Sequence, residues 1–386
     1  MINISDINSL SAKTEATGLK SKKQEIPKGK NTMLIAKKKL LEMIELTGKD
    51  SGTLPILGAV LLEQKNGNLC FRWSNLSEMI EINEPIEGNG NWVLAVPKKI
   101  LKESVQMLKG DKISVDIDVD TGRVKVSDGK IESTIKNCFP AEEFPMLPKR
   151  IETEEEEIET SIFLEGLKKV LFAVSRDENR SYLCGVHIEF SKDGLDFTAT
   201  TGAQLANWSL PIRLSEHRFQ FILPTKGVRM LLKSLAGGDY IKIRKNKEYV
   251  QFELDNVLET FHLEDLKFPK WRELISVDDS KEVVLDRKEF VGTLKTTLKI
   301  EPTARFVFDN QELTVIAENL DRRIEQKISY SGDVNISVGL NCKLLNEGIK
   351  QIKDSELRIR LKGKGDAITI KEGNYQYFLM PVDLDR

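Results

Sequence analysis

The sequence predicts an α+β protein built from three copies of one domain, each with two helices packed on an antiparallel sheet. The main observation is a segment that occurs three times, as VPKKILKESVQMLKGDKISVDID (96–118), LPTKGVRMLLKSLAGGDYIKIRK (223–245) and LNCKLLNEGIKQIKDSELRIRLK (340–362). Each copy combines an amphipathic basic helix, a short turn and an alternating strand. The copies recur every ~120 residues, which is the length of a small domain rather than of a solenoid repeat.

Composition along the chain predicts where the domains begin and end. Residues 1–32 are polar and lack periodicity, which predicts a disordered tail. Domains are then expected at 33–148, 159–276 and 281–386. The glutamates between 152 and 159 predict an exposed linker, because like charges resist collapse, and SVDDSKE (276–282) predicts a second linker.

Each domain is expected to contain two helices and several hairpin strands. The first helices are predicted at 37–49, 163–176 and 286–299, and the second helices lie inside the repeated segment. Apolar side chains in 163–176 fall on one stripe at helical spacing, namely Leu164, Leu167, Leu171 and Val174. Alternating stretches such as GLDFTATT (194–201) and ARFVFDNQELTVIAEN (304–319) predict antiparallel strands.

The composition argues against several classes of protein. The chain has 386 residues, a net charge of −2, four cysteines and three histidines, and it contains no apolar window that could span a membrane. The widely spaced cysteines predict reduced thiols in a cytoplasmic protein, and neither a metal site nor a cofactor is expected. No phosphate-binding loop, nucleophile elbow or HExxH motif is present, so the chain is not expected to be an enzyme.

The charge distribution points to a polyanionic partner. Six predicted helical stretches sum to +14, which leaves −16 for the rest of the chain. A single amphipathic helix with lysines on its wet face is usually only solvated surface. Six such helices at equivalent places on a chain without net positive charge favour instead one cationic surface on an acidic body.

The repeat and several motifs together resemble the beta sliding clamp family of bacterial replicative DNA polymerase, over about residues 33–386. The motifs are TLPILGAVLLE (53–63), FPAEEFP (139–145), SRDENRSYLCGVHIEF (175–190), FPKWREL (268–274) and FLMPVDL (378–384). The resemblance implies a head-to-tail homodimer that forms a ring of six similar domains. Duplex DNA would pass through the ring, with basic helices lining the hole and sheets outside, and the protein would be a non-catalytic processivity factor.

The basic helices supply candidate DNA contacts, because lysine and arginine on a helix face can hold phosphates without reading sequence. Resemblance adds Arg176, Arg180 and Tyr182, for which simple surface packing is an equal alternative. The other candidates are Lys49, Lys98, Lys99, Lys102, Lys168, Lys169, Lys226, Arg229, Lys233, Lys295, Lys299, Lys343 and Lys350.

The resemblance also implies an apolar pocket between the second and third domains that accepts short hydrophobic peptides from polymerase and clamp-loader subunits. Exposed aliphatic side chains and a flexible methionine suit such peptides, although the same residues could be plain core. The matching positions are Leu183, Thr200, Gly202, Leu205, Pro269, Leu274, Phe378, Met380, Pro381 and Val382.

The sequence departs from the family in ways that leave an alternative open. Ala203-Gln204 replaces the usual His-Arg pair, and Asp383 stands where a basic residue is common, so the polar rim of the pocket differs. Polar side chains also stand at the expected subunit interface, where aliphatic ones are common; they are Glu132, Thr134, Lys136, Lys295 and Thr296. A clamp-fold adaptor that binds peptides but encircles DNA poorly is therefore the alternative function, and a divergent second clamp copy is a further one.

Overall fold

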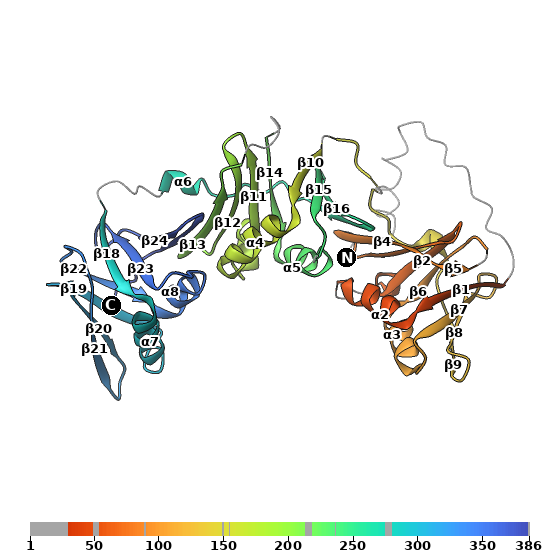
Figure 1. Ribbon diagram of the computed structural model, residues 1–386, viewed down its shortest axis with the longest axis horizontal. Helices are drawn as coiled ribbons and strands as arrows, with labels where there is room; N and C mark the ends of the chain where they lie inside the picture. The colour runs from red at the N-terminus through yellow and green to blue at the C-terminus, as the bar shows by residue number, and fades with distance from the viewer. Residues whose placement is uncertain are drawn as a thin grey trace.

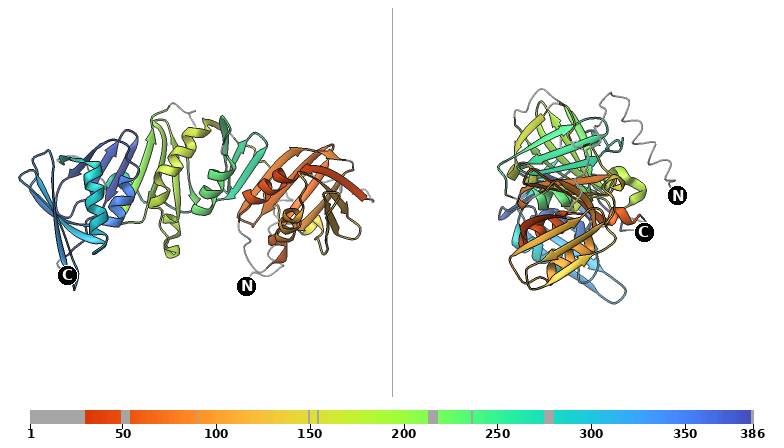
Figure 2. Two further views of the ribbon diagram at one scale, coloured as in Figure 1. Left: turned by 60° about the horizontal axis from the view of Figure 1, so that its bottom comes forward. Right: turned by 90° about the vertical axis from the view of Figure 1, so that its right-hand side faces the viewer.

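The computed structural model describes residues 30–48, 54–88, 90–148, 150–153, 155–212, 218–235, 237–274 and 280–384. These residues form an arch. Strands make up its upper side and its ends, and the longer helices lie along its concave lower side (Figure 1). When the lower side is turned forward, the same helices face the viewer (Figure 2), so both views place them on one side of the molecule.

The arch consists of three units with one order of elements: a strand, a helix, four strands, a helix and three strands. Unit 1 comprises β1 (Lys30–Ala36), α2 (Lys37–Leu46), β2 (Ala59–Lys65), β3 (Asn68–Ser74), β4 (Glu78–Pro85), β6 (Trp92–Pro97), α3 (Lys98–Met107), β7 (Lys112–Asp118), β8 (Arg123–Ser127) and β9 (Glu132–Ile135), with a two-residue strand β5 (Glu87–Gly88) in addition.

Units 2 and 3 repeat this order. Unit 2 comprises β10 (Glu155–Glu159), α4 (Thr160–Val170), β11 (Gly185–Ser191), β12 (Gly194–Thr200), β13 (Gln204–Leu210), β14 (Phe219–Pro224), α5 (Thr225–Ser234), β15 (Tyr240–Lys245), β16 (Tyr249–Leu254) and β17 (Val257–His262). Unit 3 comprises β18 (Lys281–Asp286), α7 (Arg287–Thr297), β19 (Thr303–Asp309), β20 (Glu312–Glu318), β21 (Arg323–Ser329), β22 (Ile336–Asn341), α8 (Cys342–Ile349), β23 (Glu356–Leu361), β24 (Ile368–Glu372) and β25 (Tyr375–Leu379). The predicted α+β class and the threefold repeat are confirmed.

Antiparallel sheets run across the boundaries between units. One sheet has the order β10-β15-β16-β17-β4-β3-β2-β6, so units 1 and 2 join where β17 pairs with β4; we call this joint A. The second has the order β14-β11-β12-β13-β25-β24-β23-β18, so units 2 and 3 join where β13 pairs with β25; we call this joint B. The remaining sheets, β5-β1-β7-β8-β9 and β21-β20-β19-β22, lie at the two ends of the arch (Figure 1).

The helices bury one stripe and expose the other, as their sequences predict. In α5, Val228 and Leu231 are fully buried, whereas Lys226, Arg229 and Lys233 are exposed. The first helices are shorter than predicted: α2 ends at Leu46, α4 ends at Val170 and α7 ends at Thr297. After α4, the chain tightens into one 3-10 turn, Leu171–Ala173, and Val174 is already extended, so the predicted helix ends before residue 176.

Two predictions about chain segments need correction. The glutamate-rich segment is not a solvated linker, because residues 155–159 form β10 and pair with β15. The side chains on both faces of β10 are held in the fold: Glu155 bonds Arg244 and lies 3.2 Å from the Lys242 ammonium, and Glu156, on the other face, is buried. The predicted tail is also shorter than expected, since β1 begins at Lys30; its residues 1–29 lie outside the described residues.

The four cysteines are free thiols, with Cys70 and Cys342 buried and Cys138 and Cys184 partly exposed. Burial raises the pKa of Cys138 to about 11. Within the described ranges, no helix has both the length and the apolar content that crossing a membrane requires.

Candidate nucleic-acid interface and partner pocket

Most of the predicted DNA contacts are exposed cations. They belong to, or closely follow, the six longer helices, and these helices lie along the concave side of the arch (Figure 1). The exposed set consists of Lys99, Lys168, Arg176, Lys226, Arg229, Lys233, Lys295, Lys299, Lys343 and Lys350.

The repeat places some of these cations at equivalent positions. Lys99, Lys226 and Lys343 are each the second residue of the second helix in their unit. The three units therefore present an exposed lysine at the same point of the second helix.

Three other predicted contacts are half-buried and already hold parts of the fold together. Lys98 donates to the Gly48 carbonyl oxygen at 2.8 Å, and its ammonium lies 5.4 Å from the centre of the Trp73 ring. Lys169 donates to the Gln351 carbonyl oxygen at 2.6 Å and so links unit 2 to unit 3. Lys102 forms an ion pair of 3.3 Å with Glu45. Lys49 lies outside the described residues.

The segment after α4 places Arg180 next to the predicted pocket. Residues Glu178–Leu183 form a 3-10 turn, in which the Arg180 Nε atom donates to Asp177 Oδ2 at 2.8 Å. This bond lowers the pKa of the Asp177 carboxyl. The Arg180 guanidinium faces Gly202: a Cβ added at that glycine would lie 3.2 Å from Arg180 Nη1. Arg176 is exposed and Tyr182 is half-buried in the same segment.

The predicted pocket residues come together around joint B. Leu205 on β13 lies opposite Phe378 on β25, and both are buried. The loop after β12 is closed by Thr200, whose hydroxyl donates to the Gln204 carbonyl oxygen at 2.6 Å and accepts from the Gly202 amide at 3.0 Å. Gly202 has a φ of +90°, which disfavours any residue with a side chain.

The predicted pocket has a buried floor and a more exposed rim. Leu183, Thr200, Leu205 and Phe378 are buried, whereas the side chain of Met380 is 43% exposed. Gly202 is exposed, and Pro269, Pro381 and Val382 are half-buried. Leu274 is in the short helix α6 (Trp271–Leu274), and its side chain is outside the described part.

Sequence reasoning missed Trp271, which covers the floor of this site. Its side chain is buried and packs in one cluster with Leu205 and Phe378, and the indole Nε1 atom is buried without a hydrogen-bond partner in the described part of the chain. The available signal was a single large apolar residue within the polar motif FPKWREL.

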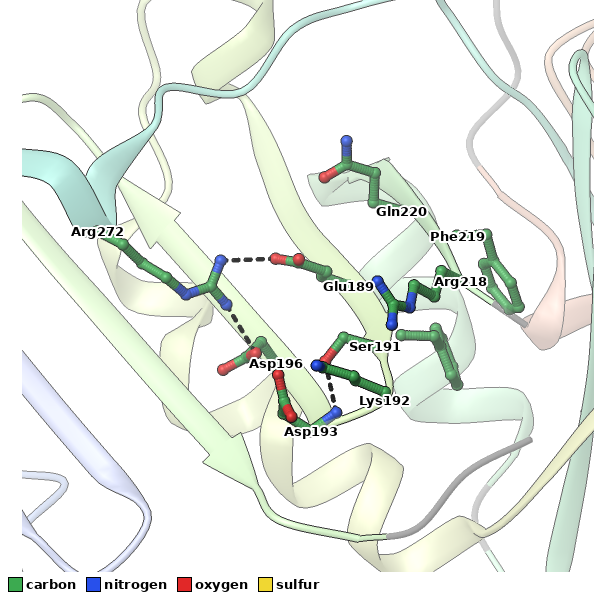
Figure 3. A pocket seen from close by; sticks show the side chains of 10 residues that line it. Glu189, Ser191, Lys192, Asp193, Asp196, Arg218, Phe219, Gln220 and Arg272 are labelled. Atoms are coloured by element: carbon green, nitrogen blue, oxygen red, sulfur yellow. Dashed lines mark hydrogen bonds and ion pairs between the residues drawn. The ribbon is translucent and has the colours of Figure 1, made fainter. Parts of the chain in front are cut away.

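The segment that carries Trp271 is held on the sheet by one ring stack and two ion pairs. Phe268 stacks on His187 with ring centres 4.7 Å apart, and burial lowers the pKa of that histidine. Arg272 donates to Glu189 at 2.8 Å and to Asp196 at 2.7 Å, beside a polar cavity of about 520 Å³ (Figure 3). These contacts position Trp271 over the pocket floor.

The sequence predicts that Ala203 and Gln204 change the polar rim of the pocket, but only Ala203 is exposed there. Ala203 is exposed, but Gln204 is 3% exposed and its Oε1 atom accepts from the Tyr377 hydroxyl at 2.8 Å. Gln204 therefore belongs to the interior of joint B. Among the described residues, no three histidine, cysteine or acidic side chains gather as metal ligands.

The fold and the site together define a protein of three repeated helix-on-sheet units with exposed cations on or near its longer helices. Residues 157–270 match the family described as the DNA polymerase III beta subunit, central domain. The chain is 25% identical to the beta sliding clamp of Escherichia coli K12 over 350 residues, which cover 86% of this chain and 93% of that protein. It is 24% identical to the beta sliding clamp of Synechococcus elongatus over 348 residues, covering 86% and 92% of the two chains.

The fold agrees with these similarities. The crystal structure of the DNA polymerase III beta subunit from Pseudomonas aeruginosa superposes with a TM-score of 0.86 at 24% identity, covering 92% of this chain and 100% of that one. The chain is therefore similar in sequence and in fold to bacterial beta sliding clamps.

Proposed function

We propose that two copies of this chain join head to tail in a ring that encircles duplex DNA and tethers a DNA polymerase to it. The protein is a non-catalytic processivity factor, and its place of action is the cytoplasm. The main support for the proposal comes from the two ends of the arch. Each end has an edge strand, and the equivalents of these two strands in the repeat pair with each other at joints A and B.

Joints A and B share one register. In joint A, Ile82 of β4 lies opposite Val257 of β17; in joint B, Trp208 of β13 lies opposite Tyr375 of β25. The hairpins β3–β4 and β12–β13 have the same pairing register across their turns, so the two joints are equivalent positions of the repeat.

The two ends of the arch supply the same pair of strands once more. By position in its sheet, β21 is the equivalent of β4 and β13, and β9 is the equivalent of β17 and β25; each is the last strand of its sheet. The shared register would place Gln326 opposite Ile131 of a second copy, and Ile324 opposite Ser133 of that copy. Such strand addition satisfies edge N–H and C=O groups that otherwise face solvent.

The end of unit 1 also exposes apolar surface that such a contact would cover. On α3, which packs beside β9, Ile100 is 45% exposed and Met107 is 57% exposed. Gln351, the equivalent of Met107, follows α8 and lies where unit 3 meets unit 2, since its carbonyl oxygen accepts from Lys169. Burying these side chains against a second copy would favour closure.

The concave surface is suited to duplex DNA of any sequence. Exposed lysines and arginines attract phosphates without base contacts, and weak contacts suffice when a closed ring holds the protein on DNA. The apolar surface around Met380, Pro381 and Val382 is the site we assign to short hydrophobic peptides of polymerase and clamp-loader subunits.

The test is topological. The protein is loaded onto nicked circular DNA by a compatible loader, and retention is measured before and after the circle is linearised. We expect retention on the circle and release from the linear form; equal retention on both would refute encirclement. Ile324→Lys, at a half-buried position of the β21 edge, should prevent retention, whereas Lys281→Glu at an exposed position of β18, away from that edge, should not.

The polar character of the edges supports the alternative function, a peptide-binding adaptor of the clamp fold. Glu132, Thr134 and Lys136 are all exposed at the β9 edge. Sedimentation at micromolar concentration separates the two functions. A dimer supports the clamp, and a monomer that persists at every concentration supports the adaptor.

A further inference from the structure

Joint A contains two carboxylic acids side by side in the interior. Glu259 on β17 is 0% exposed, and Glu78 on β4 is 8% exposed. Glu259 lies opposite Ile80, and Glu78 is two residues before Ile80 on the same face of the sheet. The two side chains are therefore diagonal neighbours across the joint.

Glu259 has no compensating partner in the described part of the chain. Neither of its carboxyl oxygens makes a hydrogen bond there. Ser234 on α5 faces the carboxyl, but its hydroxyl donates to the Met230 carbonyl oxygen at 3.0 Å. On the neighbouring strand β16, the residue opposite Glu259 is Phe252, which brings no charge.

The negative charge of Glu78 is better compensated than that of Glu259. It accepts from the Asn75 side-chain amide at 3.2 Å, and the Lys226 ammonium on α5 attracts its negative charge. The charged groups that act on the pair are thus the two carboxyls themselves and Lys226, which acts on Glu78.

Joint B holds a neutral pair at the same two positions. Tyr377, the equivalent of Glu259, lies opposite Ala206, and its hydroxyl is 2.8 Å from the Oε1 atom of Gln204, the equivalent of Glu78. The repeat therefore brings two polar side chains together at this point, and in joint B they satisfy each other without charge. Two carboxylates in that place would repel each other and lose their hydration.

The buried position of the two carboxyls also changes their affinity for protons. Burial raises the pKa of Glu259 to about 8, against an opposing effect of the Ser234 hydroxyl and with a further increase from the charge of Glu78. Burial also raises the pKa of Glu78, against the opposing effects of Asn75 and Lys226.

We propose that Glu78 and Glu259 form a proton-binding site inside joint A, which holds a proton near neutral pH and weakens the joint when that proton leaves. The proposal goes beyond the clamp function and does not depend on ring closure. It makes joint A, but not joint B, sensitive to alkaline conditions.

The direction of the effect follows from linkage. A carboxyl whose pKa is higher in the folded state binds protons more tightly there, so its contribution to stability is complete below the unfolded pKa and is lost as pH rises through the folded pKa. For Glu259 this window runs from 4.5 to about 8. One such proton changes the unfolding equilibrium constant by up to about tenfold per pH unit.

The experiment compares urea unfolding of the full chain and its Glu259→Gln variant across this window. We expect the parent to lose stability relative to the variant as pH rises, because glutamine keeps the shape of the side chain without a titrating proton. Hydrogen exchange, corrected for the intrinsic effect of pH, should show faster opening of β4 and β17 above about pH 8 in the parent, with β13 and β25 unaffected. Tyr377→Phe, the matched change in joint B, should leave the pH profile unchanged.

A spectroscopic measurement keeps the proposal testable even if the variant folds poorly. Carbon-13 resonances of labelled glutamate side chains in the parent should include one carboxyl that titrates far above the ordinary range. If every glutamate titrates near its ordinary pKa, or if the parent and Glu259→Gln have the same pH profile, the proton-binding site is wrong.

Discussion

Joints A and B have the same backbone and opposite chemistry. On the outer face of the joint A sheet, Arg72 is 5% exposed and donates to Glu81 on β4 and to Glu63 on β2, both at 2.5 Å. On the inner face, joint A holds two buried glutamates. Joint B has neutral pairs on both faces, Asn207 with Thr198, 3.0 Å apart, and Gln204 with Tyr377; the Asn207 amide also lies 3.5 Å from the Asp196 carboxylate.

The difference shows what the repeat constrains and what it leaves free. Strand order and register are shared, because they follow from hydrophobic alternation and hairpin length. The polar side chains on the two faces of the sheet differ between joint A and joint B. Joint A depends on charges that must balance one another, and joint B depends on aromatic rings and neutral hydrogen bonds.

The largest effect is expected from breaking the charged layer of joint A. Arg72→Met should lower the free energy of unfolding by about 3–5 kcal/mol, because it leaves Glu63 and Glu81 without their buried cation. Urea unfolding measures this loss. The triple change Arg72→Met, Glu63→Gln and Glu81→Gln should recover much of it, since no uncompensated charge remains; the same loss in both variants would show that packing by the arginine stem is responsible.

A slightly smaller loss is expected from opening the aromatic layer of joint B. Tyr377 is fully buried, packs near Phe172 and lies within 2.8 Å of the Leu344 carbonyl oxygen. Tyr377→Ala should cost about 3–4 kcal/mol through lost contacts and a cavity. The control Tyr377→Phe keeps the ring and should cost only about 1 kcal/mol. Equal losses in the two variants would assign the stability to the hydroxyl instead.

Much of this architecture could be predicted from the sequence, because the repeat and the alternation of apolar residues are local signals. The chemistry of the joints could not. Lys98 and Lys169 look like surface cations on their own helices, but their partners Trp73 and Gln351 are remote in sequence. The glutamates of β10 look like a solvated run for the same reason, since Arg244 and Lys242 are far along the chain.

The pocket, too, has a part that the sequence predicts and a part that depends on tertiary contacts. Leu205 and Phe378 could be assigned from the motifs that contain them. The cover that Trp271 forms over them depends on Arg272 reaching Glu189 and Asp196 on other strands, a tertiary contact that no local pattern contains.

The smallest expected effect comes from giving joint B the acid of joint A. Gln204→Glu places a carboxyl at a position that is 3% exposed, so burial should raise its pKa and make the variant lose stability as pH rises through that raised value. The loss at neutral pH should be only about 1–2 kcal/mol, because the Tyr377 hydroxyl can donate to the carboxylate, a donor that Glu259 lacks. Urea unfolding of Gln204→Glu at acidic and neutral pH measures the difference. In the double variant Gln204→Glu with Tyr377→Phe the donor is absent, and the pH-dependent loss should increase; an unchanged loss would mean that the hydroxyl does not stabilise the charge, and that joint B owes its neutrality to burial alone.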